Sequence, residues 1–188
     1  MITCIGTITK DIIHFKNKTK ERLGGAPFFF HQACQKLGVT PQIVSKAGKN
    51  LFPHFSKCIG LQEGVTTTLE IFESESETKC VCKSYSGPID VLKIPSDLLD
   101  ADIVFISPLY GDINIPNVKG KIAIDLQGFM RPDEQILCDH NKKAPGNLDA
   151  LLRKTHILKC NEQEARTIFG NMPIKSMIQA FRLLGPKI

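Results

Sequence analysis

Short apolar runs that end in a polar or small residue recur along this chain and alternate with helical patterns. Residues 2–8, 102–106 and 121–125 are the clearest runs, and each has the nearly continuous apolar character of a strand buried on both faces of a sheet. Helical patterns separate them, as at 26–37. This alternation predicts an α/β fold with a parallel sheet, because parallel neighbours need a long crossover, usually a helix.

The remaining elements are expected from the same periodicities and from capping signals. Pro27 suits the first turn of the 26–37 helix, and Gly38 suits the position just past its end. Further strands are expected at 11–15, 42–45 and 156–159, and helices at 97–101 (capped by Ser96), 148–154 (capped by Asn147), from 161 onward and at 174–184. Residues 185–188 are expected to lead into another strand.

Residues 64–92 have a different pattern. The stretch 65–72 is rich in β-branched residues, 79–85 alternates polar with apolar residues, and 73–78 between them is polar. This pattern is typical of a β-hairpin, which we expect to project from the main sheet.

Composition places the chain among ordinary globular proteins. Of its 188 residues 42% are hydrophobic and 23% charged, which fits one domain with a real core. No apolar stretch approaches the roughly 20 residues that cross a bilayer, and the first residues carry no signal-peptide pattern. The seven cysteines include no CxxC pair. We therefore expect a cytoplasmic protein with reduced thiols and no membrane contact.

The net charge of +5 has two interpretations. Basic residues gather near the N-terminus, at Lys10, Lys16, Lys18, Lys20 and Arg22, where they could touch phosphates. Their spacing of two also fits the solvated face of a strand, and Asp11 and Glu21 dilute the cluster. Because the chain has no Trp and two Tyr, no nucleic-acid partner is expected.

Two groups of polar residues follow predicted strands, where open α/β sheets place their ligands. Asp125, Gln127 and Arg131 could converge on hydroxyls or phosphate, although an Asp at a strand end is also a common turn former. Asn161 and Glu164 could form a capping box, or could form an anion and cation site at a helix start. Both pairs of alternatives stay open at this point.

Several familiar fingerprints are missing from the sequence. It contains no GxxxxGK[ST], GxGxxG or GxSxG motif, and its histidines show no metal-ligand spacing. The adjacent Gly24 and Gly25 could be a loop hinge, or could let the backbone approach a ligand in front of the following helix.

These pieces together resemble the start of the ribokinase-like, PfkB family of carbohydrate kinases. The resemblance rests on GTITKD at 6–11, GGAPFFFHQACQKLG at 24–38, residues 45–48, DLQGFMR at 125–131 and NEQE at 161–164, in the order the family has them. GGAPFFF together with DLQGFMR is most similar to the archaeal-type sugar, inositol or nucleoside kinases of that family.

The resemblance implies a ribokinase-like three-layer α/β/α sandwich with a small β lid. Residues 1–188 would be the N-terminal part of a single domain, with lid strands at about 12–24 and 64–92 inserted in it. Lid strands of this family commonly pair between subunits, so a homodimer through the lid is expected.

The resemblance also implies transfer of the γ-phosphate of ATP, with Mg²⁺, to a hydroxyl of a small sugar or polyol. Asp11 would accept hydrogen bonds from substrate hydroxyls, and Gly24 and Gly25 would form the substrate floor and the lid hinge. Gln127 and Arg131 would line the substrate side or the phosphate path. Asn161 and Glu164 match the family's NxxE motif, which helps to place magnesium and the phosphates, and no direct metal ligand is expected.

The sequence departs from the family in two places. The family often has Asn at the position of Phe29, so Phe29 would line the substrate pocket without a polar contact. The family's GAGD segment, with its general-base Asp, has no match here and is expected beyond Ile188. The chain alone is therefore expected to be a truncated and inactive kinase. The alternative hypothesis is a non-catalytic binding or dimerising remnant of a kinase fold.

Overall fold

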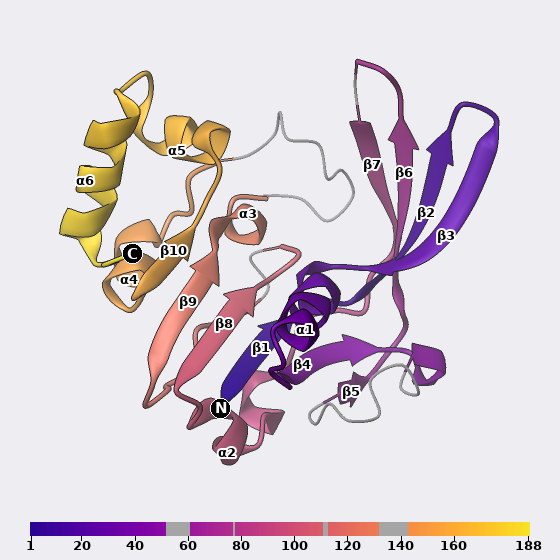
Figure 1. Ribbon diagram of the computed structural model, residues 1–188, viewed down its shortest axis with the longest axis horizontal. Helices are drawn as coiled ribbons and strands as arrows, with labels where there is room; N and C mark the ends of the chain where they lie inside the picture. Colours follow the sequence, from indigo (N-terminus) through magenta and orange to yellow (C-terminus); the bar gives the residue numbers. More distant parts are fainter. Residues whose placement is uncertain (52–60, 77, 111–112, 132–142) are drawn as a thin grey trace.

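The computed structural model describes residues 1–51, 61–76, 78–110, 113–131 and 143–188. Its centre is a six-stranded parallel sheet with the strand order β10-β9-β8-β1-β4-β5 (Figure 1). The strands are β1 (Ile2–Gly6), β4 (Gln42–Ala47), β5 (Leu61–Glu63), β8 (Ile103–Ser107), β9 (Lys121–Asp125) and β10 (Ile157–Lys159). The predicted α/β fold with a parallel sheet is confirmed.

Helices lie on both faces of this sheet. They are α1 (Ala26–Lys36), α2 (Ser96–Leu99), α3 (Leu126–Phe129), α4 (Leu148–Arg153), α5 (Glu162–Phe169), α6 (Ile174–Leu184) and the short 3-10 helix η2 (Val91–Lys93). Cys4 and Ile43 point to the face that packs against α1, whereas Ile5 and Val44 point to the face that packs against α2, α4, α5 and α6. Both faces are covered, which explains why these strands are apolar at nearly every position.

Two of the predicted helix caps differ from the structure. Ser96 is the first residue of α2, and Pro95 occupies the N-cap position. Asn147 does occupy the N-cap of α4, but its side chain makes no capping hydrogen bond. The prediction for α1 is confirmed, with Pro27 in the first turn and Gly38 at φ 73° after the helix.

A second sheet of four strands projects from the first, in the order β3-β2-β6-β7 (Figure 1). Its strands are β2 (Thr9–Phe15), β3 (Lys18–Gly24), β6 (Thr67–Glu73) and β7 (Thr78–Ser84). β6 and β7 are the two antiparallel strands predicted from 64–92, and β2 pairs with β6 in parallel. We call this the small sheet and the six-stranded one the large sheet.

The two faces of the small sheet differ in character, because successive side chains of a strand point to opposite sides. Asp11 and Ile13 of β2 are buried, and they align with Leu69 and Ile71 of β6. We call this the inner face of the small sheet; it carries Asp11, Ile13, Lys20, Arg22, Leu69 and Ile71.

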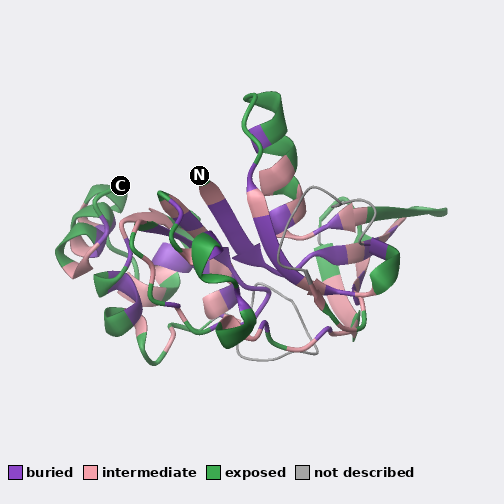
Figure 2. Cartoon of the chain, turned by 90° about the horizontal axis from the view of Figure 1, so that it is seen from below, coloured by how far each residue is buried: buried purple, intermediate pink, exposed green. Residues whose placement is uncertain are grey.

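Burial is concentrated in the large sheet. Figure 2 shows buried residues along its central strands, whereas the outward sides of the helices and much of the small sheet are exposed. The backbone of Lys187 and Ile188 hydrogen-bonds to His156 and Leu158 at the edge of β10, as expected for residues that lead into a strand.

Two further sequence-based expectations concern membrane-spanning helices and the state of the cysteines. Within the described ranges, no helix has both the length and the apolar character needed to cross a membrane. Five described cysteines carry free thiols, at positions 4, 34, 80, 82 and 160. Cys58 and Cys138 lie outside the described residues.

Candidate functional site

A pocket of about 560 Å³ lies at the carboxyl ends of the large-sheet strands, next to the start of α1 and the inner face of the small sheet. Open α/β sheets place their ligands at this edge. The polar groups that line it are Thr7, Ser107, Asp125, Gln127, Arg131 and Lys159, and the apolar wall includes Phe29, Phe30, Leu69 and Phe105. A mainly apolar wall with a few polar groups at one end suits a small organic ligand that carries oxygen functions.

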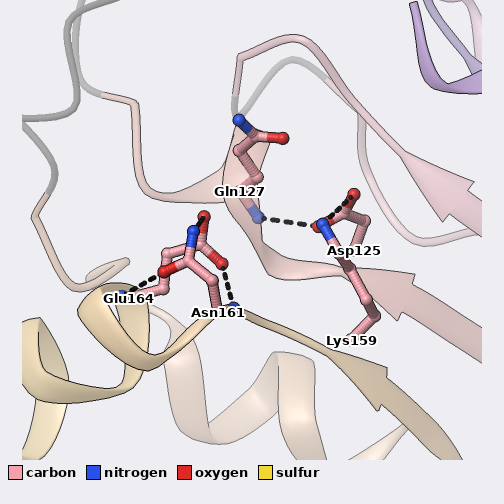
Figure 3. A network of polar contacts seen from close by, with 5 residues as sticks. All are labelled: Asp125, Gln127, Lys159, Asn161 and Glu164. Atoms are coloured by element: carbon pink, nitrogen blue, oxygen red, sulfur yellow. Dashed lines mark hydrogen bonds and ion pairs between the residues drawn. The ribbon is translucent and has the colours of Figure 1, made fainter. Parts of the chain in front are cut away.

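Asp125 and Lys159 form an ion pair at the polar end of the pocket. They are register partners on β9 and β10, and Lys159 Nζ lies 3.0 Å from each carboxylate oxygen of Asp125 (Figure 3). The carboxylate also accepts a hydrogen bond from Gln127 N at 3.3 Å and so caps the short helix α3. Asp125 thus has the turn-forming role, while its carboxylate also lines the pocket.

Gln127 and Arg131 follow Asp125 on the same turn, and both line the pocket. The side chain of Gln127 extends away from the ion pair (Figure 3). Arg131 Nη1 donates to the carbonyl of Leu109 at 3.2 Å, whereas its buried Nε has no partner among the described residues. Thr7 also has a buried hydroxyl without a described partner.

Asp11 lies on the inner face of the small sheet, beside the pocket rather than in its wall. It is 4% exposed, and it aligns with Leu69, which does line the pocket. Asp11 Oδ1 accepts a hydrogen bond from the Thr9 hydroxyl at 2.6 Å, and Oδ2 lies 3.8 Å from Arg22 Nε. Burial raises the pKa of the Asp11 carboxyl, and the Thr9 hydrogen bond and the Arg22 charge lower it in part.

The two glycines are required by their neighbours. A Cβ on Gly24 would overlap the Asp11 carboxylate, so the chain can pass this acid only without a side chain. Gly25 has φ 82°, and its Cβ would overlap the carbonyl oxygen of Thr7. Gly25 is also the N-cap of α1 and lines the pocket, as does Phe29, which is 47% exposed.

Asn161 and Glu164 form a complete capping box at the start of α5. Asn161 Oδ1 accepts from Glu164 N at 2.8 Å, and Glu164 Oε2 accepts from Asn161 N at 2.9 Å (Figure 3). Glu164 Oε1 accepts from Asn161 Nδ2 at 3.0 Å, and the residue is fully buried. Of the two interpretations, the structural one is observed directly. The part of the chain that the structure describes holds no cluster of three His, Cys, Asp or Glu suited to a metal ion.

The structure therefore brings together five of the predicted residues, Gly25, Phe29, Asp125, Gln127 and Arg131, in one pocket wall. Asp11 and Gly24 lie behind it on the small sheet, and the capping-box residues lie outside its wall. The sequence-based prediction missed Lys159, although it stands two residues before Asn161 at a strand end, like Asp125. It also missed the contact of Arg22 with Asp11, which depends on strand pairing.

Comparison with known proteins gives a match in structure alone. No protein-family model and no curated protein sequence matches the chain. A sulfate complex of a pyrophosphate-dependent kinase in the ribokinase family superposes with a TM-score of 0.83 at 22% identity, over 100% of this chain and 71% of that one. The fructokinase of Halothermothrix orenii superposes with a TM-score of 0.72 at 15% identity, over 98% of this chain and 76% of that one.

A sugar kinase of Pyrococcus horikoshii, also solved in complex with ATP, gives a TM-score of 0.66 at 18% identity, over 90% of this chain. The chain thus has the fold of the ribokinase family of sugar and polyol kinases, and it spans about 70% of the length of the first of these structures. The sequence-based resemblance to the PfkB family is confirmed at the level of the fold.

Proposed function

We propose that this protein is built for the phosphorylation of a hydroxyl on a small sugar or polyol, and that the pocket binds this acceptor. The observation that carries the proposal is the grouping of Gln127, Arg131 and the Asp125–Lys159 pair at the strand ends, opposite an aromatic wall. Amide and guanidinium groups can bind hydroxyl oxygens, and an aromatic face can cover the apolar side of a ring. The fold of sugar and inositol kinases supports the same conclusion.

In this proposal the predicted residues of the small sheet and of the strand ends bind and orient the acceptor. Asp11 accepts hydrogen bonds from acceptor hydroxyls, and Gly24 and Gly25 let the backbone pass under the acceptor and let the small sheet act as its lid. Gln127 and Arg131 orient the acceptor or the transferred phosphate. Phosphoryl transfer depends mainly on positioning and charge neutralisation, which these groups can supply.

The proposed donor is ATP with Mg²⁺. Magnesium would neutralise the phosphates. Glu164 is fully buried, and both its carboxylate oxygens accept hydrogen bonds from Asn161, so we propose that the ion binds together with the nucleotide. Asn161 and Glu164 then shape the start of α5 and do not bind the metal directly. Pyrophosphate is a second candidate donor, because the structure with the TM-score of 0.83 belongs to a pyrophosphate-dependent kinase.

Ligand binding tests the acceptor pocket. The chain is titrated calorimetrically with a panel of inositols, hexoses and nucleosides, and Arg131→Ala and Asp11→Ala are compared with the control Arg153→Ala, which alters an exposed pair on α4. We expect at least one panel member to bind, with a loss of affinity of ten-fold or more in Arg131→Ala and in Asp11→Ala and none in the control. Absence of binding, or binding that neither of these two variants weakens, would contradict the proposal.

Turnover tests whether this chain is active by itself. Phosphorus NMR follows ATP or pyrophosphate with the acceptor that binds. Because residues 1–188 have no match to the GAGD segment, we expect binding without product, and a phosphorylated acceptor formed at an ordinary enzyme rate would contradict that expectation.

We further propose that the protein is cytoplasmic and that two copies of the chain pair through their small sheets. Sedimentation analysis of the purified chain tests whether it forms a dimer.

A further inference from the structure

Arg22 stands opposite Asp11 on the neighbouring strand of the small sheet. The two residues are register partners of β3 and β2, so both point to the inner face. Arg22 Nε lies 3.8 Å from Asp11 Oδ2, and the side chain of Arg22 is about half exposed while that of Asp11 is almost fully buried. The pair therefore joins a buried carboxylate to a cation that still reaches solvent.

The same guanidinium of Arg22 also lies over an aromatic ring of the pocket wall. Arg22 Cζ lies 5.8 Å from the ring centroid of Phe29, within the range of a cation–π contact. Phe29 is itself held edge-on by Phe28, with ring centroids 5.4 Å apart. One guanidinium thus bridges the pocket wall and the buried acid beside the pocket.

Three other described residues next to Asp11 carry no charge that could compensate for its carboxylate. Thr9 on the same strand offers a hydroxyl, Gly24 on β3 has no side chain, and Leu69 on β6 is apolar. Among the described residues, Arg22 is the one cation paired with this carboxylate. An ionised carboxylate in such surroundings is costly unless a charge partner and hydrogen bonds compensate for the lost water.

We propose that Arg22 is a positioning residue that keeps the Asp11 carboxylate ionised and oriented, with Phe29 bracing its guanidinium. The proposal rests on the proposed function where it concerns ligand binding, since Asp11 is there an acceptor-binding residue. It also gives Phe29 a second role besides lining the pocket, because its aromatic ring contacts the guanidinium that pairs with Asp11.

The first test measures Asp11 itself and needs no ligand. The carbon NMR signal of the Asp11 carboxyl is titrated in the wild type, Arg22→Gln, Arg22→Lys and the control Lys20→Gln. Lys20 lies two residues away on the same strand and face, opposite the apolar Ile13, so its loss removes the same charge without a carboxylate partner. We expect the titration midpoint to move to higher pH in Arg22→Gln, to move less in Arg22→Lys, and to stay in place in Lys20→Gln.

The second test follows the consequence for binding. The acceptor affinity of Arg22→Gln should fall more in mildly acidic than in mildly basic buffer, and Phe29→Leu should show a smaller change in the same direction. A midpoint in Arg22→Gln equal to that of Lys20→Gln, with a well-dispersed spectrum that shows intact folding, would overturn the proposal. If the midpoint moves but no acceptor binds to the wild type, the proposed function fails and the role of Arg22 stands.

Discussion

Asp11 is a buried carboxylate with few polar partners. It lies on the inner face of the small sheet, away from water. The neighbouring strand β3 has Gly24 beside it, where any side chain would overlap the carboxylate. Burial of a charge without a close, saturated set of partners lowers stability. An apolar residue would pack there at lower cost, so the acid is retained at the expense of stability, as binding residues often are.

This cost predicts the behaviour of Asp11→Asn. The folded-state pKa of Asp11 is raised above its ordinary value, so the folded protein holds the proton more tightly than the unfolded chain does. Stability is therefore lost as pH rises from the ordinary Asp value through the folded value, and the full loss is present at neutral pH. Asn keeps an oxygen for the Thr9 hydroxyl and carries no charge. Denaturant titrations should show Asp11→Asn at least as stable as the wild type at neutral pH, although it no longer binds acceptor.

Asp149→Asn is a suitable control for this comparison, because the Asp149 side chain is 63% exposed and forms an ordinary helix pair with Arg153. It should leave both stability and acceptor binding unchanged. A clearly less stable Asp11→Asn protein at neutral pH would mean that the ion pair with Arg22 outweighs the cost of burial.

Residue identity alone predicted part of the candidate site. Gln127 and Arg131 could be found because they follow a strand on one short turn, and that turn is local in the sequence. Arg22 could not be assigned, because its spacing of two fits any solvated strand equally well. Its ion-pair partner, Asp11, is set by the antiparallel register of β2 and β3, and its contact with the ring of Phe29 is set by the packing of α1.

At the scale of the element, the capping box of α5 is the best-defined local device. The backbone N–H groups of Asn161 and Glu164 donate hydrogen bonds to the side-chain oxygens of Glu164 and Asn161, and Glu164 is fully buried. The start of α5 is therefore fixed in place next to the Asp125–Lys159 pair, at the carboxyl ends of β9 and β10 (Figure 3).

Asn161→Ala removes the cap and leaves the N–H of Glu164 without its acceptor. We expect the free energy of unfolding to fall by about 1 kcal/mol, or up to about 2 kcal/mol because Glu164, whose N–H loses its acceptor, is fully buried. Asn147→Ala is the matched control, since Asn147 occupies the N-cap of α4 without a side-chain hydrogen bond, and it should change stability very little. Equal losses in the two variants by chemical denaturation would contradict this account of α5.

Elements were easier to predict than their ends. The runs that became β1, β8 and β9 are apolar on both faces, and burial on both faces leaves few alternatives to a central parallel strand. We predicted the caps at Ser96 and Asn147 from residue type alone, because Ser and Asn are favoured at the N-cap position. Whether the side chain turns toward the helix depends on the preceding loop, and Pro95 shifts the start of α2 by one residue.

At the scale of the whole molecule, one apolar cluster joins the two sheets beside the pocket. Leu109 and Tyr110, just after β8, pack with Leu69 of β6, and the ring of Tyr85 meets that of Tyr110 edge-on at 5.2 Å. Burial also raises the pKa of Tyr110, so its hydroxyl stays neutral across the ordinary pH range. The inner face of the small sheet is thereby held over the pocket.

Tyr110→Ala should loosen this joint without unfolding the large sheet. Truncation of a buried aromatic side chain costs about 3 kcal/mol, and here the lost contacts lie between the sheets. Hydrogen exchange should accelerate in β6 and β7 and stay slow in β1 and β8. Leu92→Ala is the control, because Leu92 is almost fully exposed and its truncation should change neither region. Uniform acceleration across both sheets would show that they open as one unit.

The parallel pairing of β2 with β6 has a consequence for how the protein reaches its native state. Thr9 pairs with Thr67 and Phe15 with Glu73, so this ladder closes a chain segment that includes β3, α1, β4 and β5. Closing so long a loop costs entropy that local contacts do not return, so non-local ladders form slowly. The β1–α1–β4 unit, which is shorter in sequence, can form first. We infer that the β1–α1–β4 unit forms before the small sheet closes, and that the β1–β8 ladder, which pairs Ile2 with Ile103 across a still longer loop, completes the large sheet afterwards.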